Sequence, residues 1–128
     1  MVIIITDNYI NNKLSSLSKS KFRSSFHLNN KMKEYVDEKG LEKIKQDAYD
    51  FINKRLAPAS IPNDGKQTPM KQVHPVFIAQ HACACCCRNC LEKWHHISKG
   101  KDLTKEEIEY IVLLLLEWII KECQNSIK

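Results

Sequence analysis

The strongest constraint on the fold is an apolar segment near the C-terminus that follows a helix start signal. Thr104 and Glu107 have the spacing of a capping box, in which each side chain accepts a hydrogen bond from the other residue's backbone N–H. Residues 111–120 are apolar except for Glu117, so a helix there has no wide polar face to turn toward water. We therefore predict a helix over about residues 105–123 that lies between other helices, at the axis of the core.

The remaining sequence also indicates an all-α fold. With 128 residues, three glycines and four prolines, the chain has the length of one compact domain and little turn-forming material for a β-rich one. We expect a compact single-domain bundle of about five helices, with a long proline-rich loop before a central cysteine-rich helix. In this interpretation residues 1–21 are an N-terminal segment with a short helix beginning near Asp7, and residues 22–128 form a single helical domain.

Two more helices are indicated in the first half of the chain. Asn29 or Asn30 can cap a short helix, and Gly40 can end it because glycine adopts the left-handed conformation without strain. From residue 41 to residue 56 apolar residues recur at i, i+3 and i+4, which is the pattern of an amphipathic helix.

Two segments that link the predicted helices are rich in polar residues or proline. The basic connector over residues 19–28 contains Phe22 and Phe26, which we expect to anchor it to the core while Arg23 stays exposed. Residues 57–75 contain all four prolines and are predicted to form a long loop. Loops of this length in compact domains are usually functional or disordered.

The segment 74–97 holds five of the six cysteines and four of the five histidines. Pro75 suits the first turn of a helix, so we predict one continuous helix from there to about Ile97. At 100° per residue such a helix separates two faces. One face would carry Cys83, Cys86, Cys87 and Cys90, and the other would carry His81, Cys85, Arg88, His95 and His96.

The spacing of Cys87 and Cys90 is typical of zinc ligands. A site that adds His95 would require the helix to unwind near Asn89, because His95 points away from the cysteine face. A site that adds Cys83 would use one face of an unbroken helix. Its fourth ligand would come from His74, His27 or Cys123.

Two other interpretations of the cysteines remain open. Cysteine is a small apolar residue, and these cysteines can simply let another helix approach closely. Redox or nucleophilic chemistry is disfavoured on a continuous helix, because thiols in its middle lack the positive N-terminal end and a Cys86–Cys90 bridge across one turn fits poorly.

The charge distribution suggests a second function, binding of nucleic acid or a phosphate-bearing ligand. Residues 1–100 carry 16 Lys and Arg against 9 Asp and Glu, a net charge of +7. Lysines at helical spacing are, however, more often a solvated face. Residues suited to an anion pocket are Arg23, Arg55, Asp64, Lys66, Gln67, Lys71 and Arg88.

No sequence feature indicates export or a reaction. The opening apolar run MVIIIT is too short for a signal peptide and residues 111–120 are too short for a membrane span, so we expect a cytoplasmic protein with reduced thiols and no membrane partner. An enzyme centred on His81 or Cys87 is a third hypothesis, although no sequence motif names its reaction.

Three stretches resemble a bacterial family catalogued as domain of unknown function 4186: NDGKQTPM (63–70), HPVFIAQHACACCCRNCLEKWH (74–95) and KGKDLT (99–104). The resemblance implies that the loop and the cysteine segment work as one unit. That family's pattern has alanine or threonine at the positions of Cys83 and Cys85, which implies packing roles for these two. The leading hypothesis is therefore a small metal-binding or structural module whose zinc ligands come from Cys86, Cys87, Cys90, His74, His81 and His95.

Overall fold

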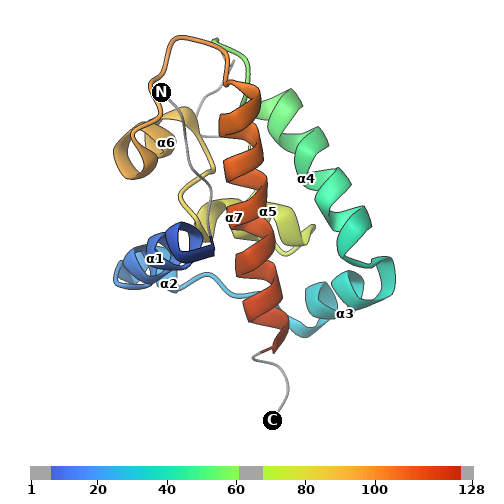
Figure 1. Cartoon of the computed structure of the whole chain (residues 1–128). Helices are drawn as coiled ribbons and strands as arrows, with labels where there is room; N and C mark the ends of the chain where they lie inside the picture. Colours follow the sequence, from blue (N-terminus) through green and yellow to red (C-terminus); the bar gives the residue numbers. More distant parts are fainter. Residues whose placement is uncertain (1–6, 61–67, 125–128) are drawn as a thin grey trace.

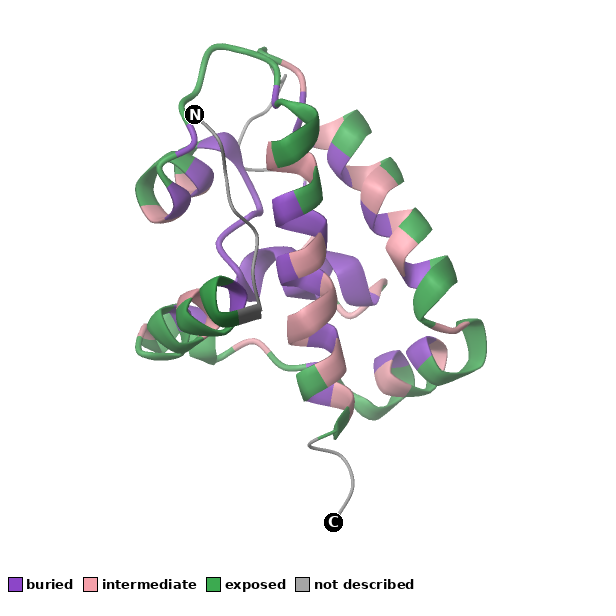
Figure 2. Cartoon of the chain, viewed as in Figure 1, coloured by how far each residue is buried: buried purple, intermediate pink, exposed green. Residues whose placement is uncertain are grey.

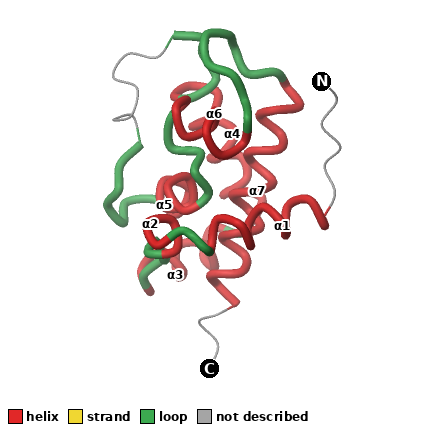
Figure 3. Tube along the Cα trace, turned by 90° about the vertical axis from the view of Figure 1, so that its left-hand side faces the viewer, coloured by secondary structure: helices red, strands yellow, loops and turns green. Residues whose placement is uncertain are grey.

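The computed structural model describes residues 7–60 and 68–124, and these residues form seven α-helices and no strand (Figure 1, Figure 3). The predicted all-α class is confirmed. The helices are α1 (Asp7–Ser18), α2 (Lys21–Ser24), α3 (Asn30–Lys39), α4 (Leu41–Arg55), α5 (Pro75–Ala82), α6 (Arg88–His95) and α7 (Lys105–Gln124).

Helix α7 is the axis of the core, as predicted. It runs through the middle of the molecule with α4 along one side and α1 on the other, and it packs against α1, α4 and α5 (Figure 1). Ile111, Leu115 and Ile119 are fully buried along it. The capping box forms, with Thr104 N–H donating to Glu107 Oε1 over 2.8 Å and Glu107 N–H to Thr104 Oγ1 over 3.1 Å. Among the described helices, none combines the length and apolarity needed to cross a membrane.

The predicted helices of the first half are also present. The Asn29 side chain caps α3 by accepting a hydrogen bond from Met32 N–H over 2.9 Å. Gly40 separates α3 from α4 with a φ of 84° and a ψ of 154°. The φ is positive, as expected for glycine, but the extended ψ differs from the left-handed helical turn that we predicted.

The predicted continuous helix over residues 75–97 is wrong, because the chain leaves α5 after Ala82 and begins α6 only at Arg88. Ala84 adopts a φ of 58°. Its N–H donates to His81 O, and the N–H of Cys85 donates to Gln80 O over 2.7 Å. This is the Schellman pattern that ends helices, here with alanine where glycine is usual. The break and the short α2 account for seven helices instead of about five.

Side chains satisfy the carbonyl groups that the break leaves without helical partners. Cys83 O lies 2.8 Å from His95 Nε2, and Cys86 O accepts from Thr68 Oγ1 over 2.9 Å. Gln80 Nε2 donates to Cys85 O over 3.1 Å. Because buried carbonyls need hydrogen bonds, these donors stabilise the broken form. Figure 2 shows that α5 and the segment after it are buried throughout.

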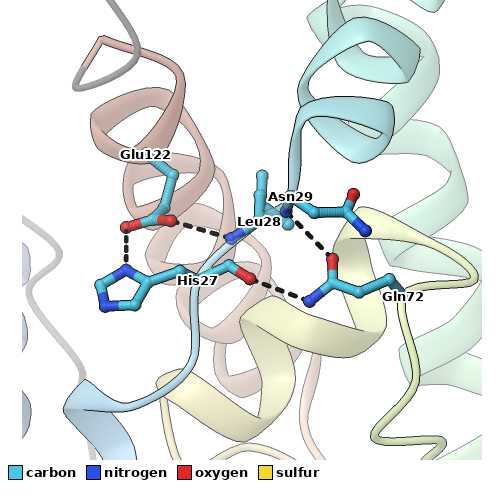
Figure 4. Close-up of polar contacts among 5 residues, drawn as sticks. All are labelled: His27, Leu28, Asn29, Gln72 and Glu122. Atoms are coloured by element: carbon cyan, nitrogen blue, oxygen red, sulfur yellow. Dashed lines mark hydrogen bonds and ion pairs between the residues drawn. The ribbon is translucent and has the colours of Figure 1, made fainter.

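The connector after α2 is held by two polar side chains (Figure 4). Glu122 on α7 accepts from Leu28 N–H over 2.9 Å, and its other oxygen lies 3.1 Å from His27 Nδ1. The Gln72 amide accepts from Asn29 N–H over 3.2 Å and donates to His27 O over 2.9 Å. The connector is therefore fixed both to the end of α7 and to the segment before α5.

Replacing the buried carboxylate of Glu122 is expected to destabilise the fold. Glu122→Ala leaves the buried N–H of Leu28 without its acceptor, and we predict a loss of about 1–3 kcal/mol in the free energy of unfolding, measured by urea denaturation. The matched control is Glu117→Ala on the same helix, because Glu117 makes only an exposed contact of 3.8 Å with Lys121. Equal effects of the two substitutions would contradict the role assigned to Glu122.

Candidate metal centre

Three cysteines converge where α6 begins. The Sγ atoms of Cys86, Cys87 and Cys90 all lie within 4.8 Å of one another, and those of Cys86 and Cys90 are 3.6 Å apart. Cys86 precedes the helix, Cys87 is its N-cap, and Cys90 lies in its first turn. The Cys87 sulfur also accepts a hydrogen bond from Cys90 N–H over 3.4 Å. The break between α5 and α6 is thus what brings the three sulfurs together.

Arg23 lies against this three-cysteine cluster, and the expectation that Arg23 is exposed is wrong. It is 7% exposed, whereas the neighbouring Phe22, predicted to be an anchor, is 53% exposed. Arg23 Nη2 lies 3.1 Å from Cys90 Sγ, and Nη1 lies 3.6 Å from Cys86 Sγ and donates to His81 O over 2.7 Å. A guanidinium can be buried at this position because these acceptors replace water.

These contacts shift the pKa values of two cysteines of the cluster in opposite directions. The pKa of Cys90 is well below its ordinary value, because its sulfur accepts hydrogen bonds from the thiols of Cys86 and Cys87 and from the Arg23 guanidinium. The pKa of Cys86 is raised, because its thiol is the hydrogen-bonding partner of Cys87 and Cys90 and is buried. Of the three thiols, that of Cys90 has its pKa shifted toward the thiolate form, and its sulfur lies closer to the Arg23 guanidinium than that of Cys86 does.

The remaining cysteines stand apart from the cluster. Cys83 and Cys85 are fully buried in the hydrophobic core, and burial raises the pKa of both thiols. The sulfur of Cys83 does not join the grouped sulfurs, so the predicted Cys83-based zinc site is wrong. Cys123 lies near the C-terminal end of α7, beside a groove of about 610 Å³ between α3 and α7.

His74 and His81 make structural contacts instead of joining the cluster. His74 is the N-cap of α5: its Nδ1 accepts from Val76 N–H over 3.0 Å, and its Nε2 lies 3.1 Å from Asp47 Oδ2 on α4. His81 Nε2 lies 2.9 Å from Thr68 O. Burial lowers the pKa of both histidines, which favours the neutral forms that these contacts use.

His95 bridges the break to α7. Its Nε2 lies 2.8 Å from Cys83 O and 3.6 Å from Cys85 Sγ, and its Nδ1 lies 2.8 Å from the Tyr110 hydroxyl. A carbonyl only accepts, so Nε2 carries the proton and Nδ1 accepts from Tyr110. Burial lowers the pKa of His95 to about 4. Like the other two histidines, it lies outside the grouped ligand atoms of the described residues.

Arg88 is an internal structural group, and the helix face that it was predicted to share with His81 and His95 does not form because the helix is broken. It is 3% exposed, and its two terminal nitrogens donate to five backbone carbonyls over 2.8–3.4 Å. These carbonyls belong to Leu56, Ala57, Pro58, Ser98 and Lys101. Arg88 therefore ties the start of α6 to the end of α4 and to the segment before α7.

Of the other residues proposed for an anion pocket, Arg55 and Lys71 lie in the described part of the chain. The Arg55 guanidinium lies over the rings of Phe51 and Phe77, at 5.4 and 5.0 Å from their centroids. Lys71 is exposed. The predicted residues Asp64, Lys66 and Gln67 lie outside the described part of the chain.

A family model described as Domain of unknown function (DUF4186) matches residues 11–120. The match extends from α1 into α7 and includes the three-cysteine cluster, Arg23 and the break. The chain belongs to the DUF4186 family. No solved structure matches it.

Three residues that stabilise the break in this DUF4186 protein were not predicted to do so. Thr68 and Gln80 lie within the stretches that carry the family resemblance, whereas Tyr110 lies in the apolar α7. Each makes a buried hydrogen bond in or next to the break. The hydrogen-bonding capacity of these side chains was the available signal, but it identifies no partner until the fold brings the segments together.

Acidification is expected to destabilise this DUF4186 chain through His95. Its pKa falls from an ordinary 6.5 to about 4 on folding, so between these values the unfolded chain binds more protons and the free energy of unfolding falls as the pH falls. We predict that His95→Gln makes this dependence shallower by up to about 1.4 kcal/mol per pH unit in urea titrations from pH 7 to pH 4.

The control for this titration is His96→Asn. His96 is exposed and has a φ of 58°, a conformation that asparagine tolerates. We expect this variant to keep most of the slope of the unmodified chain, because burial is the largest cause of the lowered pKa of His95. A His95→Gln slope equal to both would contradict the assignment.

Proposed function

We propose that Cys86, Cys87 and Cys90 bind a zinc ion, and that the protein is a small metal-binding module built around it. The observation that carries the proposal is the convergence of these three sulfurs, while Cys83 and Cys85 pack in the core. Three thiols that only filled space would not need to face one another.

The spacing of the sulfurs supports zinc. Sulfurs bound tetrahedrally to one zinc ion at about 2.3 Å lie about 3.8 Å from one another. The 3.6 Å separation of Cys86 and Cys90 is already close to this value. The third sulfur, that of Cys87, lies within 4.8 Å of both. Small side-chain rotations would therefore bring all three to zinc–sulfur distance.

The charges also support a divalent ion. Three thiolates carry a charge of −3, which zinc at +2 and the Arg23 guanidinium at +1 neutralise together. Buried charges are tolerated when they are paired and hydrogen-bonded, and Arg23 contacts two of the three sulfurs. The single positive charge of Arg23 neutralises only one thiolate, so zinc would neutralise the other two.

Hydrogen bonds around the cluster would hold the ligands in place. Cys90 N–H donates to Cys87 Sγ, and Arg23 holds Cys90 and Cys86 from the other side. Such outer contacts orient metal ligands and raise affinity. Three protein sulfurs leave one position of a tetrahedral zinc ion for a fourth donor. The metal would join the break to the start of α6, and Arg23 of α2 would contact two of its ligands.

Metal binding by variants tests the proposal. We expect the purified protein to contain one zinc per chain by elemental analysis, and to give sulfur-to-cobalt charge-transfer bands when loaded with Co²⁺. We predict that Cys90→Ser lowers zinc affinity by more than about 100-fold, since loss of a ligand should exceed the effect of losing an outer contact. Arg23→Lys should lower it by about 10-fold.

The matched control is Cys123→Ser, because Cys123 is a partly buried cysteine at a distance from the cluster. It should leave the stoichiometry and the cobalt spectrum unchanged. Absence of stoichiometric metal, together with unfolding that a chelator does not affect, would reject the metal site and leave packing as the role of these thiols.

A further inference from the structure

The three-cysteine cluster also has the geometry of a redox pair. Cys86 Sγ and Cys90 Sγ are 3.6 Å apart, and an approach of about 1.6 Å would bring them to disulfide bonding distance. Within one continuous helix such a bridge fits poorly, but Cys86 lies outside α6, directly before its N-cap. The break therefore removes the geometric objection to a disulfide.

The two sulfurs differ in access and in environment. Cys90 is partly exposed, contacts the Arg23 guanidinium at 3.1 Å and lies in the first turn of α6, where backbone N–H groups favour a thiolate. Cys86 is 8% exposed, and its sulfur is 3.6 Å from that of Cys90. Cys90 is thus placed to meet a reagent from solvent, and Cys86 is placed to attack the product.

We propose that Cys90 and Cys86 form a reversible disulfide on reaction with a hydroperoxide. The Cys90 thiolate attacks the terminal oxygen of the hydroperoxide, the O–O bond breaks, and the alkoxide that leaves takes a proton to become an alcohol. The product on Cys90 is a sulfenic acid. The Cys86 thiol then attacks the Cys90 sulfur and water leaves, so the two sulfurs give up the two electrons that reduce the peroxide.

The disulfide would also control the metal, an extension that rests on the proposed function. Oxidation consumes two of the three zinc ligands, and a single remaining cysteine cannot retain the ion. Zinc itself is not redox-active, so its release reports oxidation of the sulfurs alone. A thiol reductant would break the disulfide by exchange and restore the site.

Peptide mapping of the whole chain can detect a disulfide between Cys90 and the segment that holds Cys86 together with Cys83, Cys85 and Cys87. Trypsin cleaves after Lys71, Arg88 and Lys93, which places Cys86 in peptide 72–88 and Cys90 in peptide 89–93. After treatment with hydrogen peroxide and alkylation of free thiols, we expect mass spectrometry to show these two peptides linked, and a reductant to separate them. Absence of the link in the metal-free protein would overturn the proposal.

Variants identify the partners of the bond. We expect the link to persist in Cys87→Ser and to disappear in Cys86→Ser, with far-UV circular dichroism confirming that both variants fold. Arg23→Lys should form it about tenfold more slowly, through the loss of a hydrogen bond to a charged sulfur. Cys123→Ser is the control with unchanged rate. A link that persists in Cys86→Ser and is lost in Cys87→Ser would reject the assigned pair.

The experiments can reject the metal site and the redox pair independently of each other. If the purified chain binds no zinc but peroxide links the two peptides, the metal site is wrong and the redox pair stands. If the chain binds zinc and no link forms even after a chelator removes the ion, the redox pair is wrong and the metal site stands. Release of zinc in step with the appearance of the linked peptides supports both.

Discussion

The contact between the Arg23 guanidinium and the cysteine sulfurs is the interaction on which the site depends. A buried positive charge must be neutralised and hydrogen-bonded, and Arg23 achieves this with two sulfurs and the carbonyl of His81. In an uninterrupted helix that carbonyl would accept from the N–H of residue 85. Because α5 ends at Ala82, that carbonyl instead accepts a 3.4 Å bond from Ala84 N–H and a 2.7 Å bond from Arg23, and this one side chain joins α2 to both sides of the break.

The break divides the polar residues of the cysteine segment into two groups with different tasks. Three cysteines face one another at the start of α6, whereas the histidines support the backbone: His74 caps α5, and His95 satisfies Cys83 O while accepting from Tyr110. A segment rich in cysteine and histidine resembles a set of metal ligands as a whole. Here the hydrogen bonds of His74 and His95 stabilise the end of α5 and the break, and this backbone brings the cysteine sulfurs together.

The metal and redox proposals describe two states of the same sulfurs. With zinc, three thiolates balance the ion and Arg23 together. Without it, Arg23 contacts Cys90 at 3.1 Å and Cys90 lies 3.6 Å from Cys86, so a sulfenic acid that a hydroperoxide forms on Cys90 would have the Cys86 thiol beside it. The two states exclude each other, because the disulfide removes two zinc ligands.

The sequence by itself determined the all-α class, the limits of α3 and α4 and the central place of α7, because capping residues and apolar periodicity act within a few residues along the chain. It also named Cys86, Cys87 and Cys90. Only the tertiary structure decided the break and the burial of Arg23. No glycine or proline marks residues 83–87; the donors that stabilise the break come from Thr68, Gln80 and His95. Thr68 and His95 meet it only when distant segments pack together, so no local pattern could predict the break.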